Sequence, residues 1–399
     1  MVISPVSPDL LDYRFIGLLS VIGLLRWLCP QRAFSLFGAL MSAALIGFVA
    51  PTSAVVVMTI TLLFVYPAHR LMCYADARRW THSIQRAIFL GAVFALVALL
   101  AVFKFHQQLS ARHASGARLD TSAIELIGFS YFMFRVIGFL HVQSILKQPA
   151  SPLTLVFYTM FPSTFTSGPI QKYQDFKRQT DSPAAIDAAL LTKGVYRVTR
   201  GYFRKLVVAE LFNRAVISVL ALTPTVWTSG VAVLLLYLYF YFDFAGYSDL
   251  AVGFGLFLGI NVPDNFRKPF TATTVSEFWR HYHITLVDWF RDHVFVPLGG
   301  LTGSRVRAAL VAAVVMLLCG FWHGLTISFL AWGVWHGGML FIEALMGSTP
   351  VPPSRRQGPQ YWSRVLWTNA RIAFGAIFFL PDPAATIRLI KGFGHLGLR

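Results

Sequence analysis

The stretch AIFLGAVFALVALLAVF, residues 87–103, contains neither a charge nor a proline. As a helix it would cover most of the ~30 Å hydrocarbon layer of a bilayer, and an ordinary soluble core needs no such run. The rest of the chain has the same character, because 56% of its 399 residues are hydrophobic, 13% are charged and the mean hydropathy is +0.61. Composition therefore predicts a membrane protein and excludes the disordered, collagenous and small disulfide-linked classes.

Apolar runs recur along the chain as candidates for membrane helices, at residues 15–28, 33–50, 54–66, 87–103, 124–145, 153–165, 206–222, 226–242, 308–318, 327–341 and 365–380. Several are shorter than the roughly 20 residues that a straight span needs, which predicts tilted or re-entrant elements. Irregular backbone at membrane depth must be covered by protein or line a polar cavity. We expect an all-α, polytopic fold of about 10–11 transmembrane or re-entrant helices, with interfacial amphipathic helices in addition.

The formal net charge of +17 is compatible with a nucleic-acid binder. However, the basic residues are scattered between apolar runs and form no continuous patch, so we expect no nucleic-acid partner. Their densest group lies in residues 171–205, which hold eight basic and three acidic side chains. The positive-inside rule places this segment, and a second basic loop at residues 70–86, in the cytoplasm.

The cysteines and the N-terminal region carry no sign of a secreted protein. Cys29, Cys73 and Cys319 are widely spaced and odd in number, which argues against a disulfide framework. The first apolar run follows two acidic residues and Arg14 instead of a basic stretch. We therefore expect this run to be retained as the first membrane helix and not removed as a signal peptide.

Residues 263–300 carry too many charges to cross lipid and too many aromatic residues for a solvated loop. Within residues 276–293, an aromatic and apolar stripe recurs at steps of three and four, as expected for an amphipathic helix at the interface. Glu277 and Arg280, like Asp288 and Arg291, are spaced to form ion pairs. A surface helix without any chemical role explains this pattern as well as a functional one does.

Ionisable side chains within apolar segments are costly, and each is therefore a candidate for function. Asp243, Asp249, His283, His323 and His336 are the clearest cases. His323 is the strongest, because it ends an apolar stretch and has Gly320 and Gly324 nearby. A neutral imidazole there could take a proton from a hydroxyl group, although a histidine that only binds a neighbouring carbonyl would have the same pattern.

Other chemistries fit the sequence less well. His281 and His283 could contribute to a zinc site with other histidines, but residues two apart point in different directions on a helix, and no metal site is predicted. The glycines of residues 253–259 miss the dinucleotide-binding spacing and suit close helix packing better, with Ala251, Gly255 and Gly259 on one face. There is no GxSxG element of a serine hydrolase. A histidine-lined interior would also suit a transporter.

Several motifs resemble, in order, those of the membrane-bound O-acyltransferase family, and specifically its bacterial branch of alginate O-acetylation and teichoic-acid D-alanylation proteins. The similar stretches are FP at 161–162, SGPI at 167–170, YFDFAGYSDLAVG at 241–253, NF at 265–266 with PF at 269–270, EFWRHYHIT at 277–285, WFRD at 289–292, PLGG at 297–300, WHG at 322–324 and WGVWHG at 332–337. The resemblance covers about residues 124–393. It suggests N-terminal membrane helices in residues 1–120 and a catalytic core in residues 121–393, within one integral membrane domain.

The resemblance implies helices around a central pore, with a cytoplasmic entrance for the acyl donor and an outer entrance for the acceptor. It identifies His323 and His283 as catalytic residues, with His323 as the base and His283 across the pore. It places Arg280, Asp288, Trp289 and Arg291 at the cytoplasmic mouth. Further substrate-binding residues are expected at Trp322, Asp243, Tyr247, Ser248 and His336.

The expected function is transfer of a short acyl group, preferably acetyl, from a cytoplasmic thioester to a hydroxyl group that modifies an exported polysaccharide. No cofactor is expected to be bound, and the co-substrate would be acyl-coenzyme A or an acyl-carrier thioester. Expected partners are that donor, a periplasmic esterase-like acyltransferase, a polysaccharide synthase complex and membrane lipid, in a multi-pass protein of the bacterial inner membrane. Acylation of a lipid or secreted small molecule, a transporter and a scaffold remain alternatives.

Overall fold

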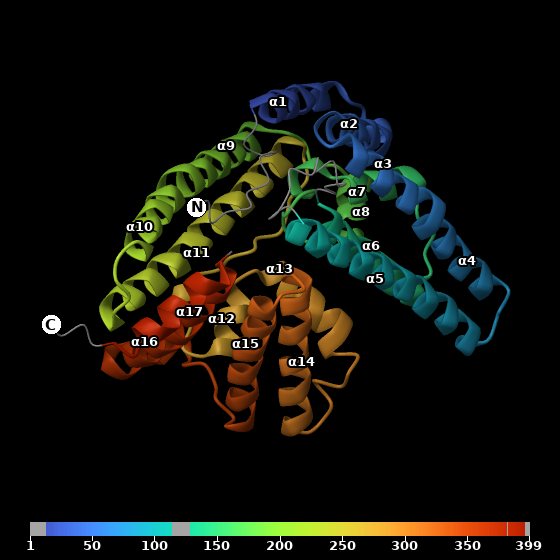
Figure 1. Cartoon of the computed structure of the whole chain (residues 1–399). Helices are drawn as coiled ribbons and strands as arrows, with labels where there is room; N and C mark the ends of the chain where they lie inside the picture. The colour runs from blue at the N-terminus through green and yellow to red at the C-terminus, as the bar shows by residue number, and fades with distance from the viewer. Residues whose placement is uncertain (1–12, 114–127, 381, 396–399) are drawn as a thin grey trace. The chain divides into compact units, whose positions relative to one another are not determined.

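The computed structural model describes residues 13–113, 128–380 and 382–395. These residues form α-helices joined by short 3₁₀ and π segments and loops, with one isolated β-bridge between Phe266 and Tyr282 (Figure 1). The predicted all-α class is confirmed. The chain divides into two compact units, and helices α9 (Ala188–Tyr202) and α11 (Val226–Phe257) pass from one unit to the other.

Among the described residues, the N-terminal unit consists of residues 13–113, 128–198 and 250–263. Besides parts of α9 and α11, it contains α1 (Tyr13–Leu28), α2 (Phe34–Val49), α3 (Pro51–Ile60), the π segment η3 (Thr61–Val65), α4 (Tyr66–Ala77), α5 (His82–His113), α6 (Phe129–Leu146), α7 (Pro152–Thr159), the 3₁₀ turn η4 (Pro162–Thr164) and α8 (Tyr173–Asp181).

Among the described residues, the C-terminal unit is formed by residues 199–249, 264–380 and 382–395. Its elements are the π segment η5 (Phe203–Ala209), α10 (Glu210–Leu220), α12 (Val275–His281), α13 (Ile284–Phe290), the π segment η7 (Arg291–Phe295), α14 (Arg305–His323), α15 (Ile327–Leu345), α16 (Gly358–Gly375), the 3₁₀ turn η9 (Ala376–Phe379) and α17 (Pro383–Gly392). These units reflect spatial compactness, and the division at residue 120 stays a prediction.

Within the described residues, six helices are long and apolar enough to span a membrane: Gln31–Val49, Pro51–Ala77, His82–Gln108, Phe129–Leu146, Val226–Phe257 and Arg305–His323. The chain is thus a multi-pass membrane protein. The other predicted runs fall on shorter or less apolar elements, for example residues 153–165 on α7 and η4. Part of the run 124–145 lies outside the described residues, and the central pore stays a prediction.

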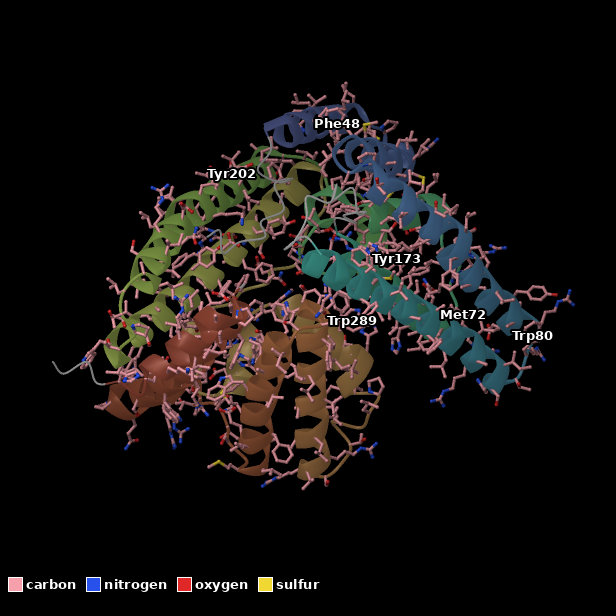
Figure 2. All side chains as sticks on the ribbon, viewed as in Figure 1. Phe48, Met72, Trp80, Tyr173, Tyr202 and Trp289 are labelled. Carbon is pink, nitrogen blue, oxygen red and sulfur yellow. The ribbon has the colours of Figure 1, made fainter. Side chains whose placement is uncertain are left out.

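The outer surface of these helices is apolar, as a lipid environment requires. In the most apolar segment of the span His82–Gln108 only 11% of the residues are buried within the protein. Phe48 and Trp80 lie at the surface, whereas Met72 and Tyr173 are buried between helices of the N-terminal unit (Figure 2). Large exposed apolar side chains would be an aggregation hazard in water, and here they indicate contact with acyl chains.

A buried arginine organises the short elements between α6 and α8. Arg135 of α6 is 2% exposed and donates hydrogen bonds to the carbonyl oxygens of Tyr158 (3.3 Å), Thr159 (3.2 Å) and Thr164. These carbonyls lie where α7 ends and the chain turns, so they lack helical partners. The guanidinium therefore satisfies backbone groups that would otherwise be costly at membrane depth.

Helices α14 and α15 form a hairpin that is held together by glycine (Figure 1). A methyl group added to Gly320 would lie 2.4 Å from the carbonyl oxygen of Phe329, and one added to Gly333 would lie 2.9 Å from the carbonyl oxygen of Met316. Backbones approach this closely only where side chains are absent, which is how small residues support helix association in membranes.

The small-residue face predicted at Ala251, Gly255 and Gly259 is only partly correct. Helix α11 ends at Phe257, and Gly259 adopts a left-handed turn (φ +75°) instead of continuing the helix. Gly253, and not Gly255, is the glycine that meets α9, because its added methyl group would lie 2.9 Å from the carbonyl oxygen of Gly194. The spacing of four is compatible with a helix, but it does not reveal where the helix ends.

We predict that Gly320→Ala destabilises the protein by about 1–3 kcal/mol, because α14 and α15 must separate to admit the methyl group. Gly338→Ala, also on α15, is the matched control, since no atom lies within 4 Å of the added carbon. Thermal unfolding of the two variants in detergent should show a lower midpoint for the first and an unchanged or slightly higher one for the second. Equal midpoints would contradict the close packing.

Candidate active site

His323 ends α14 and lies in an aromatic box formed by Trp322, Phe329, Trp332 and Phe379. Its ring is stacked on Phe329 at 5.6 Å between centroids, and Phe379 meets it edge-on at 4.9 Å. The side chain is half-buried, so it is neither sealed in the core nor fully exposed. The box thus holds the imidazole between apolar walls.

His283 lies between α12 and α13 in a left-handed backbone conformation (φ +50°, ψ +48°). Such a conformation is unfavourable for a residue with a Cβ atom and persists only where the surroundings enforce it. The ring is 6% exposed and lies 4.6 Å from the ring of Phe244 on α11. Burial lowers the pKa of His283, and the nearby His323 lowers it further, so the two histidines lie within electrostatic reach and His283 is neutral at pH 7.

Asn265 enforces this turn, and sequence analysis did not single it out as a site residue. Its Oδ1 accepts hydrogen bonds from the backbone N–H (3.2 Å) and the hydroxyl group (2.6 Å) of Thr285, and its carbonyl oxygen accepts one from the N–H of Ile284 (3.0 Å). Its Nδ2 donates to Ser248 on α11 (3.4 Å). Because Asn265 is 1% exposed, these bonds form away from water, and they connect the His283 turn to α11.

His336 lies behind the aromatic box and not inside it. The side chain is 2% exposed, and its ring lies 4.6 Å from Trp332 and 5.1 Å from Trp279. A methyl group added to Gly375 of α16 would come within 2.3 Å of its Nε2. Trp332 therefore contacts both His323 and His336, which gives His336 a place in the wall that supports the box.

Two buried glutamates fix α12 to the neighbouring helices. Glu343 of α15 accepts hydrogen bonds from the backbone N–H groups of Val275 (2.9 Å) and Ser276 (3.1 Å), and it pairs with Arg371 (3.2 Å). Glu277 pairs with Arg356 at 2.5 Å. The predicted Glu277–Arg280 ion pair is wrong, because Glu277 points into the protein, whereas Arg280 is exposed.

The two aspartates of α11, for which the sequence offered no partner, are both in ion pairs. Asp249 accepts hydrogen bonds from Arg200 (2.5 and 2.9 Å) and from Arg204 (2.7 Å), and Asp243 accepts one from Lys205 (2.6 Å). Their partners come from α9 and η5. Asp249 and Lys205 are almost fully buried, so these pairs hold the helices together at depth.

The other predicted residues occupy several environments. Tyr247 and Ser248 are buried on α11, Asp288 and Trp289 are half-buried on α13, and Arg291 is exposed and pairs with Asp292 at 3.1 Å. The continuous amphipathic helix expected over residues 276–293 is wrong, because the chain breaks at Tyr282 and His283 into two short helices. The pattern could not show this break, since histidine rarely adopts a left-handed conformation.

Two pockets outlined by described residues lie in the N-terminal unit, and neither is lined by a predicted site residue. No group of three or more His, Cys, Asp and Glu side chains among the described residues is arranged to hold a metal ion. The site brings together two histidines, one inside an aromatic box and one fixed by a strained turn.

Comparison with known proteins defines the class to which this fold and site belong. The model of the membrane-bound O-acyltransferase family matches residues 36–380, and the chain belongs to this family.

Among curated relatives, the chain is 30% identical to the probable alginate O-acetylase of Pseudomonas aeruginosa over 294 residues, 71% of this chain and 55% of the relative. It is 29% identical to the teichoic acid D-alanyltransferase of Streptococcus thermophilus over 331 residues, 78% of this chain and 77% of the relative. It is 32% identical to the peptidoglycan O-acetyltransferase of Helicobacter pylori over 201 residues, 47% of this chain and 36% of the relative. The chain thus spans about half the length of the alginate O-acetylases that it matches.

We predict that Asn265→Ala destabilises the protein by about 1–3 kcal/mol, because the buried N–H and hydroxyl groups of Thr285 lose their acceptor. Ser248→Ala removes only the longer bond to Asn265 and should cost much less. Thermal unfolding in detergent measures both effects. A loss for Ser248→Ala as large as that for Asn265→Ala would show that the hydrogen bonds from Thr285 to Asn265 do not stabilise the His283 turn.

Proposed function

We propose that this protein is an O-acyltransferase in which His323 is the general base. The half-buried imidazole of His323, held in the aromatic box, is the observation that carries the proposal. A base needs access to its substrate, and a half-buried position between rings leaves one side of the imidazole accessible. Membership of the acyltransferase family supports the same assignment.

In the proposed reaction, His323 takes the proton of an acceptor hydroxyl group as its oxygen attacks the carbonyl carbon of a thioester. The new C–O bond forms, the C–S bond breaks, and the proton passes from the imidazolium to the departing thiolate. The aromatic box would limit competing hydrolysis, because apolar walls exclude water from the reacting carbonyl. His283, neutral and fixed by Asn265, would orient the donor or the acceptor by a hydrogen bond.

We further propose acetyl as the acyl group and a hydroxyl group on the route to an exported polysaccharide as the acceptor. The relatives named as an alginate O-acetylase and a peptidoglycan O-acetyltransferase support this choice. The relative named as a teichoic acid D-alanyltransferase supports an aminoacyl group as the alternative. The donor would be acetyl-coenzyme A or an acetyl-carrier thioester in the cytoplasm. The acceptor could be the glycan itself, a periplasmic esterase-like partner that relays the group, or a lipid or secreted small molecule. A polysaccharide synthase complex would supply the glycan in the bacterial inner membrane.

We predict that His323→Ala lowers the rate of ester formation about 10²–10⁴-fold, the usual contribution of a general base. Purified protein in proteoliposomes, supplied with labelled acetyl thioester and an acceptor polysaccharide, measures this rate. His106→Ala, at an exposed position of α5, is the matched control and should keep the wild-type rate.

Folded His323→Ala protein with near-wild-type turnover would remove His323 from the mechanism. The same vesicles test the transporter alternative, because a transporter would accumulate label inside without forming an ester. A scaffold would form no ester in either the wild-type or the variant protein.

A further inference from the structure

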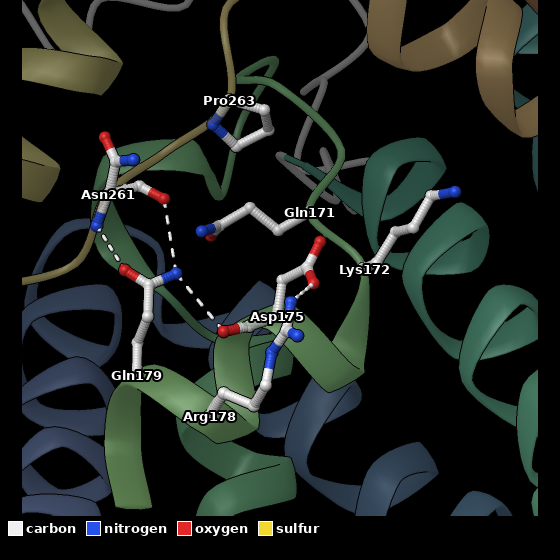
Figure 3. Close-up of a pocket in the computed structure, with 7 residues that line it drawn as sticks. All are labelled: Gln171, Lys172, Asp175, Arg178, Gln179, Asn261 and Pro263. Carbon is white, nitrogen blue, oxygen red and sulfur yellow. Dashed lines mark hydrogen bonds and ion pairs between the residues drawn. The ribbon is translucent and has the colours of Figure 1, made fainter. Parts of the chain in front are cut away.

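A pocket of about 330 Å³, lined mostly by residues with polar side chains, lies in the N-terminal unit, outside the candidate active site. It follows one face of α8 and is bordered by the loop after α11, with walls formed by Gln171, Lys172, Asp175, Arg178, Gln179, Asn261 and Pro263 (Figure 3). Its volume is at the lower end of the range of small-molecule sites, larger than a phosphate ion alone would fill.

The loop is attached to α8 by paired hydrogen bonds. The backbone N–H of Asn261 donates to Oε1 of Gln179 (2.6 Å), and Nε2 of Gln179 donates to the carbonyl oxygens of Asn261 (3.3 Å) and Asp175 (3.2 Å). These bonds use both N–H groups of the Gln179 amide and connect the loop to α8. The pocket is therefore a built feature of the fold and not a gap between mobile side chains.

Gln171 is the side chain in this pocket whose polar end is left unsatisfied. It is 4% exposed, and among the described residues no acceptor lies within hydrogen-bonding distance of its Nε2. Figure 3 shows its amide pointing toward Asn261 and Pro263, into the pocket. A buried donor without a partner costs about 1–3 kcal/mol, so an acceptor supplied by a ligand would explain why it is placed there.

The electrostatics of the pocket favour an anionic acceptor. The pocket begins at the N-terminus of α8, a nine-residue helix with no side-chain cap, where the helix dipole is positive. Arg178 contributes a positive charge to the walls and Asp175, which pairs with it, a negative one, while the side chain of Lys172 starts at the wall and extends away from the other residues drawn (Figure 3). The surrounding segment, residues 171–205, is also strongly basic.

We propose that this pocket binds the phosphate group of an organic phosphate ester, with Nε2 of Gln171 donating a hydrogen bond to a phosphate oxygen. The organic part would fill the remaining volume beside Pro263. On the side where the positive-inside rule places this segment, two sources offer such a group: coenzyme A and the headgroup of an anionic phospholipid. The inference concerns binding only, and it stands whether or not the chain transfers acyl groups.

The test measures binding to the wild-type protein and to Gln171→Met, which keeps the length of the side chain but removes the donor. In lipid-depleted detergent, calorimetric titration with coenzyme A, and with inorganic phosphate as a competitor, tests the first source. Native mass spectrometry of protein loaded with phosphatidylglycerol or phosphatidylcholine tests the second. We expect Gln171→Met to weaken binding of one of these phosphate esters about tenfold.

Gln174→Met is the matched control, because Nε2 of Gln174 is also buried without a partner, but its side chain does not line the pocket. This variant should bind the phosphate ester with the wild-type affinity. Gln171→Met should unfold at a higher temperature than the unliganded wild type, since it loses an unsatisfied buried amide. Weaker binding in a more stable protein separates a ligand contact from a structural role.

The source is identified by which probe loses affinity in Gln171→Met. A loss confined to coenzyme A points to the donor, and a loss confined to phosphatidylglycerol points to the membrane. Equal affinity of the wild type and Gln171→Met for both probes, or no binding of either, would overturn the proposal. The outcome is independent of turnover, so it is distinguishable from failure of the proposed acyl transfer.

Discussion

The fold depends on satisfying each buried charge and backbone polar group without water. A carboxylate or guanidinium at membrane depth is tolerated only when it is paired. Asp249 meets two arginines, Glu343 serves both the start of α12 and Arg371, and Arg135 serves carbonyl oxygens at the end of α7. In each case the polar group fixes two elements relative to one another. Polar contacts therefore position the helices, while most of the buried surface is apolar.

This constraint also explains how the candidate site is assembled. The turn that contains His283 is held by Asn265, which bonds to Thr285 and connects the turn to Ser248 of α11. His323 is positioned by a hairpin whose glycines allow close backbone contact, and by aromatic rings that need no hydrogen-bond partner. Two different devices, a strained polar turn and an apolar box, thus present two imidazoles within electrostatic reach of each other.

The sequence predicted the helical class and the apolar runs, because hydropathy is a local property that lipid enforces directly. It also singled out His283 and His323, since ionisable residues stand out against apolar neighbours. It failed where the answer depends on distant contacts: the partners of Asp243 and Asp249 lie some 40 residues away on α9 and η5. It also failed to predict the break before α13, because the left-handed conformation of His283 does not change the periodicity of the apolar residues. Asn265 could have been noticed only as part of a motif, and Glu343 as a lone carboxylate near the end of an apolar block.

The contact between His336 and Gly375 limits which amino-acid substitutions the protein can accept during evolution. The imidazole occupies the space in which any side chain at position 375 would lie. The two positions therefore share a single volume, and a larger residue at one requires a smaller residue at the other. Substitutions at this crossing of α15 and α16 should be viable as compensating pairs and seldom as single steps, so the back wall of the aromatic box can be remodelled only by coordinated replacement.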